Sequence, residues 1–253
     1  MSFLAVRNLT ARFGAFTAFE DVSIELERGA LVGLIGTNGA GKSTLFSAVT
    51  GYIRTHSGSV HFAGEDVSEL SIEHRVQRGL ARTFQVPREF GRLSVFHNLM
   101  AAAPHQVGES LFGLVFAAPK VARQEAELAE RAREMMRFLN LSRVADAPAG
   151  TLSGGQKKLL ELGRLLMLEP SCILLDEPFA GVNPVLIQEI SQRILELNQR
   201  GITLFIIEHD LAGLSRLVPK IYAMDRGRII AEGTPDEVLA DRHVREAYMG
   251  GVI

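Results

Sequence analysis

One segment of the chain joins a short apolar run to a glycine-rich turn and then to a helix-forming stretch. The apolar run is Leu31 to Ile35, the turn begins at Gly36, and a helix is expected from about Lys42 to Thr50. An apolar run between glycines suits a strand that is buried on both faces of a sheet. The spacing Gly-x-x-x-x-Gly-Lys-Ser in this strand–loop–helix context predicts a phosphate-binding loop, and therefore an α/β fold.

The residues of this loop each have an expected part in binding phosphate. Glycines let backbone N–H groups approach the anion because no Cβ blocks them, and the helix that follows adds its positive end. By the general roles of this motif, the lysine supplies a full charge to the outer phosphates and the serine hydroxyl binds Mg²⁺. The predicted nucleotide-binding residues are Gly36, Asn38, Gly39, Ala40, Gly41, Lys42, Ser43 and Thr44.

Two adjacent carboxylates, Asp176 and Glu177, follow a second apolar run from Cys172 to Leu175. Ligands of open α/β sheets bind at the carboxyl ends of the strands, so these acids are expected near the nucleotide. Adjacent carboxylates at such a position repel each other unless a cation or substrate uses them. We predict that Asp176 holds Mg²⁺, directly or through water, and that Glu177 orients and partly deprotonates the attacking water.

The rest of the chain divides into regions with different patterns. The first ~30 residues alternate as strands do. Residues 87–150 are mainly helical, because apolar side chains recur at helical spacing from Val121 to Leu139. We predict one domain over 1–253, with an α/β core formed by 1–86 and 151–253 and a helical subdomain at 87–150.

Helices and strands alternate again after residue 150, which predicts parallel crossovers and a doubly wound sheet. Ser153 and Gln156 have the spacing of a capping box, and the helix that they begin is expected to run to Glu169, before Pro170. Asn183 is expected to cap the next helix, with Pro184 as its first residue. A strand from Ile202 to Ile207, a hairpin near Gly227 and a helix from Thr234 are expected to follow.

Composition excludes several classes of protein. The 27 basic and 29 acidic residues give a net charge of −2, so no basic surface is predicted and we expect no nucleic-acid partner. The single cysteine, Cys172, excludes an internal disulfide. No run of about 18 apolar residues and no signal peptide is recognisable, so a cytoplasmic location is expected.

Taken together, these motifs resemble the ATP-binding subunits of ABC transporters over nearly the whole chain. The segment Leu152-Ser153-Gly154-Gly155-Gln156 is similar to the family's signature sequence, which simple phosphate-loop GTPases and kinases lack. The resemblance implies an ABC cassette fold, with an antiparallel β subdomain and an inserted helical subdomain, that binds and hydrolyses ATP with Mg²⁺. It also implies that two cassettes pair head to tail, so that Ser153, Gly154, Gly155 and Gln156 of one copy contact the nucleotide held by the other.

The resemblance also assigns roles to residues that carry little signal by themselves. Gln85 corresponds to the glutamine that contacts Mg²⁺ and senses the permease, and His209 to the switch histidine at the γ-phosphate. Phe13 corresponds to the aromatic residue that stacks on adenine, where tyrosine is usual. Asn183 lies where many members have aspartate, and this departure weakens any argument for coupling between cassettes through that position.

Further segments resemble the branched-chain amino acid importer subfamily, although importers of urea and short amides share them. The resemblance implies transmembrane permease subunits that dock near Gln85, a second cassette that is identical or merely similar, and an extracytoplasmic solute-binding protein. It places the chain on the cytoplasmic face of the inner membrane as a peripheral subunit. The segments that carry it are Arg82-Thr83-Phe84-Gln85, Ala180-Gly181-Val182-Asn183-Pro184, Ile207-Glu208-His209-Asp210-Leu211 and Glu246-Ala247-Tyr248.

Two alternatives remain open. A cassette without a permease, acting in assembly or translation, is less consistent with the sequence because translation factors of this kind normally carry two cassettes in one chain. A chromosome or repair ATPase would need a long coiled coil, and the helical insert is too short to supply one.

Overall fold

The computed structural model of the chain describes residues 2–83, 89–104, 118–209 and 211–249. These residues belong to two compact units, and each is described by itself. The core unit comprises residues 1–85, 170–180 and 187–253, and the helical unit comprises residues 86–169 and 181–186.

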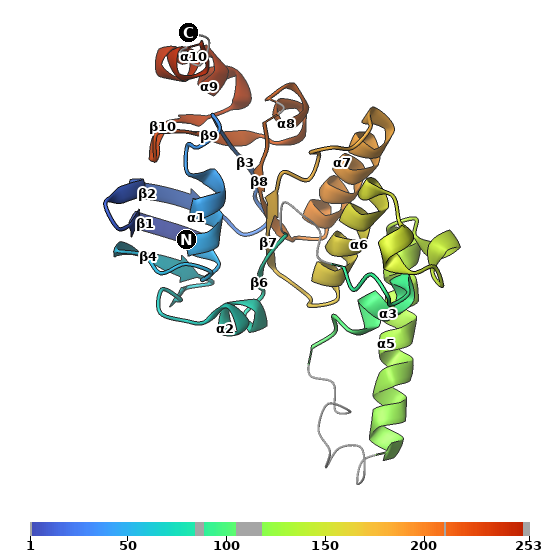
Figure 1. Cartoon of the computed structure of the whole chain (residues 1–253). Coiled ribbons are helices and arrows are strands. Elements are labelled where there is room, and N and C mark those ends of the chain that lie inside the picture. The colour runs from blue at the N-terminus through green and yellow to red at the C-terminus, as the bar shows by residue number, and fades with distance from the viewer. Residues whose placement is uncertain (1, 84–88, 105–117, 210, 250–253) are drawn as a thin grey trace. The chain divides into compact units, whose positions relative to one another are not determined.

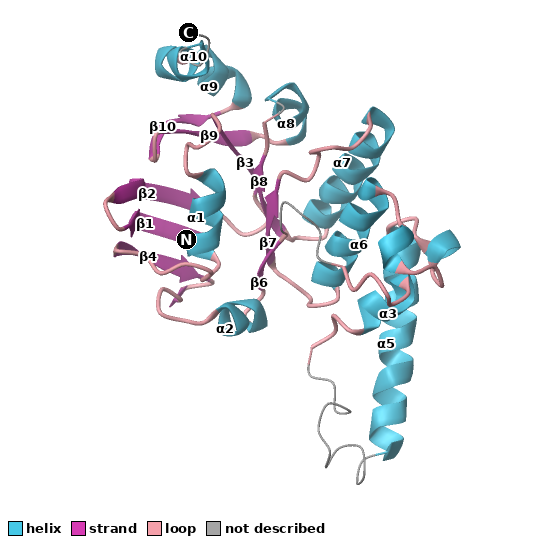
Figure 2. Ribbon diagram, in the orientation of Figure 1, coloured by secondary structure: helices cyan, strands magenta, loops and turns pink. Residues whose placement is uncertain are grey.

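The described strands of the core unit form two sheets (Figures 1 and 2). The first is antiparallel, with the strand order β2-β1-β4-β5. Its strands are β1 (Leu4–Phe13), β2 (Phe16–Leu26), β4 (Ser57–Phe62) and β5 (Glu65–Asp66).

The second sheet has the order β10-β9-β3-β8-β7-β6. Its strands are β3 (Leu31–Gly36), β6 (Leu80–Arg82), β7 (Cys172–Asp176), β8 (Thr203–Ile207), β9 (Lys220–Asp225) and β10 (Arg228–Gly233). All pairs are parallel except β9 with β10, which form the expected hairpin. The mixed α/β architecture with a doubly wound parallel sheet is therefore confirmed.

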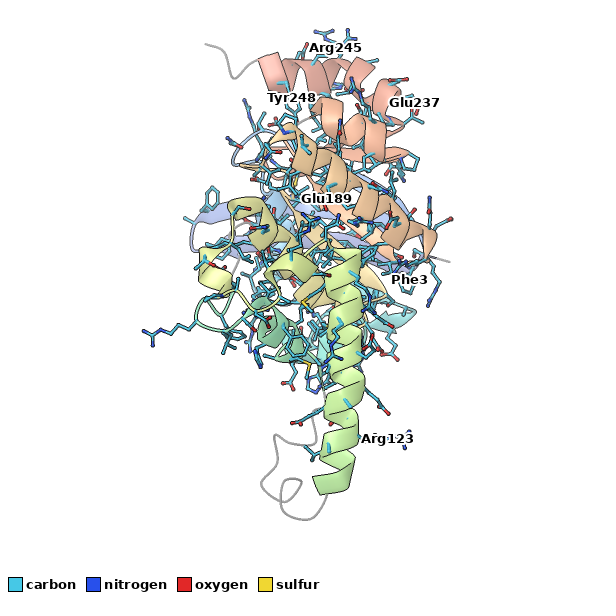
Figure 3. The ribbon with its side chains drawn as sticks, turned by 90° about the vertical axis from the view of Figure 1, so that its right-hand side faces the viewer. Phe3, Arg123, Glu189, Glu237, Arg245 and Tyr248 are labelled. Atoms are coloured by element: carbon cyan, nitrogen blue, oxygen red, sulfur yellow. The ribbon has the colours of Figure 1, made fainter. Side chains whose placement is uncertain are left out.

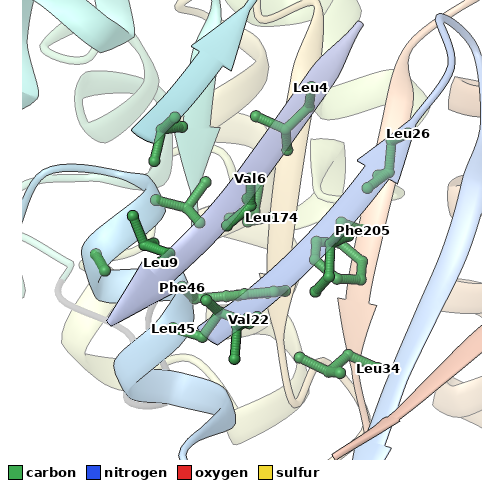
Figure 4. Close-up of a cluster of buried hydrophobic side chains, with 14 of the residues drawn as sticks. Leu4, Val6, Leu9, Val22, Leu26, Leu34, Leu45, Phe46, Leu174 and Phe205 are labelled. Carbon is green, nitrogen blue, oxygen red and sulfur yellow. The ribbon is translucent and has the colours of Figure 1, made fainter. Parts of the chain in front are cut away.

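The hydrophobic core of this unit joins the two sheets through the helix that follows the phosphate loop. Side chains from β1 and β2 meet Leu45 and Phe46 of α1 (Lys42–Val49), which in turn meet Leu174 of β7 and Phe205 of β8 (Figure 4). The rings of Phe46 and Phe205 lie 5.0 Å apart, between centroids. Burial of these side chains anchors α1, and thereby its N-terminal end, against the carboxyl end of the parallel sheet.

The remaining helices of the core unit include two at the C-terminal end of the chain that pack beside β10 (Figure 1). The first of these begins after Thr234, as predicted, and Thr234 and Glu237 form a capping box there. These helices are α2 (Ile72–Gln77), α8 (Leu211–Leu217), α9 (Pro235–Ala240), α10 (Arg242–Met249) and most of α7 (Pro184–Gln199).

The described residues of the helical unit form three α-helices, two short 3₁₀ turns and the start of α7. The longest helix carries charged side chains along much of its length, among them Arg123, which pairs with Glu127 at 2.9 Å (Figure 3). The elements are α3 (Val95–Met100), α5 (Ala118–Phe138), η2 (Ser142–Val144), η3 (Ala149–Thr151) and α6 (Gly154–Leu166). None of the helices in the described parts of the chain is long and apolar enough to cross a bilayer.

Two boundaries differ from the expectations. The helix α6 groups with α3 and α5, against which it packs, whereas the sequence placed residues from 151 onward with the core. This helix also ends at Leu166 rather than at Glu169. The residue before a proline avoids helical geometry, and Glu169, which precedes Pro170, has a φ of 54°.

Candidate nucleotide-binding site

The phosphate loop lies between the end of β3 and the start of α1 and has a backbone that requires glycine. Gly41, the N-cap of α1, has a φ of 100°, and a Cβ there would lie 2.6 Å from the carbonyl oxygen of Ala18. Because Gly41 has no side chain, the first N–H groups of α1 receive no capping hydrogen bond from the N-cap residue. Such an N-terminus is suited to an anion.

Lys42 is buried within the loop, where its ammonium group binds backbone oxygens. Its Nζ donates to the carbonyl oxygens of Gly36 at 2.7 Å and of Thr37 at 3.0 Å. Burial lowers the pKa of Lys42 below its ordinary value, and the negative charges of Glu177 and Asp176 oppose that shift.

Asp176, the last residue of β7, is buried and reaches three polar partners. Its Oδ1 accepts from Ser43 Oγ at 3.2 Å, and its Oδ2 accepts from Arg82 at 2.6 Å. Its backbone N–H donates to Thr83 Oγ1 at 3.0 Å. The predicted Mg²⁺ ligands Ser43 and Asp176 are thus adjacent.

The oxygen atoms beside the end of β7 suit Mg²⁺, which prefers hard oxygen ligands and binds through few protein groups. Ser43 Oγ and Asp176 Oδ1 are such donors, and within the described ranges no cluster of three or more histidine, cysteine or acidic side chains forms a cage for a metal. The remaining ligands of an ion here would come from phosphate, water and the predicted glutamine. That glutamine, Gln85, lies outside the described residues.

Glu177 and His209 contact each other at the carboxyl ends of β7 and β8. The distance between Glu177 Oε1 and His209 Nε2 is 2.5 Å. Glu177 has a φ of 51°, a left-handed conformation that is uncommon for a residue with a side chain, and its N–H donates to Ile207 of β8 at 3.0 Å. Glu208 braces the same region, because its carboxylate accepts from the N–H groups of Phe179 and His209.

A pocket of ≈ 630 Å³ collects most of the predicted residues of the core unit. It is lined by the loop residues 38–44, Glu177 and His209, together with Ala18 and Phe16. Phe13 does not line it, although it pairs with Phe16 across the turn of the β1–β2 hairpin and both rings are exposed. Phe16 was not among the predicted residues, although the sequence has a second aromatic residue three positions after Phe13, on the other side of Gly14.

The signature segment begins α6 in the helical unit. Ser153 Oγ accepts from the N–H of Gln156 at 3.3 Å, and the Gln156 side chain accepts from the N–H of Ser153 at 3.0 Å. Ser153 and Gly154 are exposed, whereas Gly155 is buried against Leu186. Asn183 accepts from the N–H of Leu186 at 3.0 Å and so caps α7, as predicted.

Comparison with known proteins identifies relatives along the full length of the chain. Residues 19–180 match the ABC transporter family, and residues 228–252 match the family "Branched-chain amino acid ATP-binding cassette transporter". A probable branched-chain amino acid transport ATP-binding protein LivG of Methanocaldococcus jannaschii is 39% identical, with 99% of this chain and 98% of the relative aligned. The lipopolysaccharide export system ATP-binding protein LptB of Haemophilus influenzae is 35% identical, over 99% of this chain and 98% of the relative.

Solved structures give the same result. A nucleotide-free ATP-binding cassette from an ABC transporter superposes with a TM-score of 0.85 at 38% identity, covering 98% of this chain and 99% of that one. The ADP conformation of such a cassette superposes with a TM-score of 0.84, also at 38% identity and covering 99% of both chains.

Proposed function

We propose that this chain, which belongs to the ABC transporter family, powers the uptake of branched-chain amino acids through a separate permease. Membership of the family makes it an ATP-hydrolysing, ATP-binding subunit of a transporter. The solute and the direction of transport are our proposal. The observation that carries them is the match of residues 228–252, which hold β10, α9 and α10, to the branched-chain amino acid cassette family.

In the proposed reaction, Lys42 exchanges the carbonyl oxygens of Gly36 and Thr37 for the outer phosphates of ATP. The exchange is favourable for a buried ammonium, because it attracts a negatively charged phosphate more strongly than a neutral carbonyl oxygen. The exposed rings of Phe13 and Phe16 offer π-faces for the adenine. The loop residues Gly36, Asn38, Gly39, Ala40, Gly41, Ser43 and Thr44 surround the phosphates.

Glu177 acts as the general base in this proposal, and His209 holds it. The contact between the two side chains orients the Glu177 carboxylate, which accepts a proton from the attacking water. Ser43 and Asp176, together with Gln85, would hold Mg²⁺, which spreads the charge that develops on the transferred phosphoryl group.

We propose further that two cassettes share each nucleotide. Ser153, Gly154, Gly155 and Gln156 of one copy would contact the γ-phosphate held by Lys42 of the other, using the N-terminus of α6. ATP then links the copies, and hydrolysis removes the link. The γ-phosphate therefore shifts the equilibrium between paired and separated cassettes toward the paired state. The second copy is this chain or a similar cassette.

The remaining partners follow from the same proposal. The helical unit meets the permease near Gln85, and the core unit, residues 1–85, 170–180 and 187–253, carries out the catalysis. The permease holds the chain at the cytoplasmic face of the inner membrane as a peripheral subunit. An extracytoplasmic binding protein supplies the solute, and no nucleic acid takes part.

Affinity purification of the tagged full chain from membranes, followed by solute binding to the co-purified binding protein, tests the proposal. Two permeases and a binding protein that takes up leucine, isoleucine or valine are expected. The export system of the LptB relatives is the competing assignment, and co-purification of lipopolysaccharide-binding components would establish it instead. Recovery of ribosomes or assembly proteins without any permease would show a cassette that does not serve transport.

A further inference from the structure

A buried arginine spans the two elements that carry the proposed Mg²⁺ ligands. Arg82, the last residue of β6, donates from one terminal nitrogen to Asp176 Oδ2 at 2.6 Å and from the other to Ser47 Oγ at 2.7 Å. The side chains of Arg82 and Asp176 are 8% and 1% exposed, so solvent screens this ion pair little. The Nε atom of Arg82 has no partner among the described residues, so its polar contacts are made by the two terminal nitrogens.

The contact with Ser47 extends to the phosphate loop. Ser47 lies one turn after Ser43 in α1, and its hydroxyl donates to the Ser43 carbonyl oxygen at 2.7 Å. One guanidinium is therefore linked to the β7 carboxylate directly and to the backbone of Ser43 through one hydroxyl. Between these two ends, Ser43 Oγ and Asp176 Oδ1 lie 3.2 Å apart.

We propose that Arg82 is a positioning residue that holds Ser43 and Asp176 at the separation that Mg²⁺ requires. The inference rests on the proposed role of these two residues as metal ligands. Mg²⁺ tolerates little departure from octahedral geometry, so a change in the separation of two ligands lowers its affinity. Groups that hydrogen-bond to metal-ligating carboxylates typically account for 10- to 100-fold of metal affinity.

The geometry requires arginine rather than lysine. The planar guanidinium offers two terminal nitrogens that diverge toward different partners, whereas an ammonium is a single point that reaches one of them well. The guanidinium carbon of Arg82 also lies 5.9 Å from the centre of the Phe46 ring, within α1. The same side chain thus contacts α1 at two residues and β7 at one.

Nucleotide binding measured with and without metal tests the role. ADP binding to the full chain is followed by calorimetry in EDTA and at a series of free Mg²⁺ concentrations, and Mn²⁺ binding to the ADP complex is followed by electron paramagnetic resonance. The variants are Arg82→Met, Arg82→Lys and Ser47→Ala. The control is Arg78→Met, because Arg78 forms an exposed ion pair with Glu65 and contacts neither Ser47 nor Asp176 in the described structure.

We expect the metal dissociation constant to rise about 10- to 100-fold in Arg82→Met and less in Arg82→Lys. Ser47→Ala, which keeps the buried ion pair and therefore the fold, should raise it by a few fold, and Arg78→Met should leave it unchanged. ADP affinity in EDTA should stay at the wild-type value in Ser47→Ala and Arg82→Lys. A purely structural defect would lower affinity equally with and without metal, and that result would overturn the inference.

Two further outcomes also decide the matter. Unchanged metal affinity in all three variants, or tighter Mn²⁺ binding in Arg82→Met, would show that the arginine does not position the ligands. If the wild-type chain itself binds ADP equally well in EDTA and in Mg²⁺, then the proposed metal ligands are wrong, which is a separate failure from that of Arg82.

Discussion

The helices α1 and α6 both begin beside paired glycines, yet the two N-termini are built differently. At α1 the N-cap is Gly41, which has a φ of 100° and no side chain with which to cap the helix. At α6 the N-cap is Ser153, and both hydrogen bonds of a capping box with Gln156 are present. Gly39 and Gly41 have positive φ values, whereas Gly154 and Gly155 do not.

Similar glycine patterns therefore serve two different physical needs. In the phosphate loop, glycine provides a backbone conformation, and the N–H groups of α1 remain available beside a buried lysine. In the signature segment, the capping box already satisfies part of the helix N-terminus, and Gly155 provides space for Leu186. The first region places an uncapped helix N-terminus beside a buried lysine, whereas the second exposes Ser153 and Gly154 at a helix end that already has a capping box.

The largest effect is expected at Glu177, which lines the same pocket as the phosphate loop of the first region. Glu177→Gln keeps the shape of the side chain but removes its basicity, so steady-state ATP hydrolysis should fall by about 10²- to 10⁴-fold. ATP binding, measured by equilibrium dialysis, should persist because Lys42 and the loop are intact. Glu127→Gln, on an exposed face of α5, is the control. Full turnover by Glu177→Gln would refute the assignment of the base.

The next largest effect is expected at Lys42 of α1, and Lys157 of α6 serves as the comparison. Lys42→Met removes a buried ammonium from the phosphate site and should weaken ATP binding by about 10- to 100-fold, the range for hydrogen bonds to charged groups. Lys157, in the first turn of α6, pairs instead with Glu89 at 2.7 Å. Lys157→Met should leave nucleotide binding by the single chain unchanged in a fluorescence titration. Equal losses in both variants would contradict the difference between the two helix ends.

Much of this comparison was predictable from the sequence, because it depends on local patterns. The phosphate loop, the capping box at Ser153 and the cap at Asn183 are set by residues a few positions apart, and the structure has all of them. The strand–helix alternation likewise predicted the parallel sheet. The role of a residue such as Phe16 depends instead on the register of a hairpin, which brings it opposite Phe13.

Contacts between distant strands were not predictable in the same way. Arg82 and Asp176 are far apart in the chain and meet only because β6 pairs with β7 in the sheet. The contact between Glu177 and His209 depends similarly on the pairing of β7 with β8. Sequence patterns indicate that each residue ends a strand, but the choice of neighbouring strand comes from the packing of the whole core.

A smaller effect is expected at the exposed end of α6. Ser153→Arg removes the cap and places a long side chain where the partner's nucleotide would approach, so ATP-dependent pairing should weaken at least about tenfold. Sedimentation of the variants in ATP, with hydrolysis blocked by Glu177→Gln, measures it. Ser153→Ala, which loses the cap without adding bulk, separates the two causes. Normal pairing by Ser153→Arg would count against a head-to-tail arrangement.

The smallest effect compares the two glycines of α6 with each other. Nothing lies within 4 Å of a Cβ built on Gly154, whereas one built on Gly155 would lie 1.6 Å from Leu186 Cδ2. Gly154→Ala should therefore stabilise the chain by about 0.5–1 kcal/mol, since alanine is the better helix former. Gly155→Ala should lose that gain and about 1 kcal/mol more, because Leu186 must leave its rotamer.

Chemical denaturation of the two alanine variants measures the difference between their free energies of unfolding. ATP-dependent pairing, measured on the same proteins, shows whether either glycine also serves the contact between cassettes. If the exposed Gly154 serves the shared nucleotide, then its variant should be the more stable protein and the weaker partner. Gly155→Ala should be the less stable protein whose pairing is affected only through the shift of Leu186. Equal stability of the two variants would show that Leu186 relaxes at no cost. Space for Leu186 would then not explain the glycine at position 155, and the two glycines of α6 would not differ in the way proposed here.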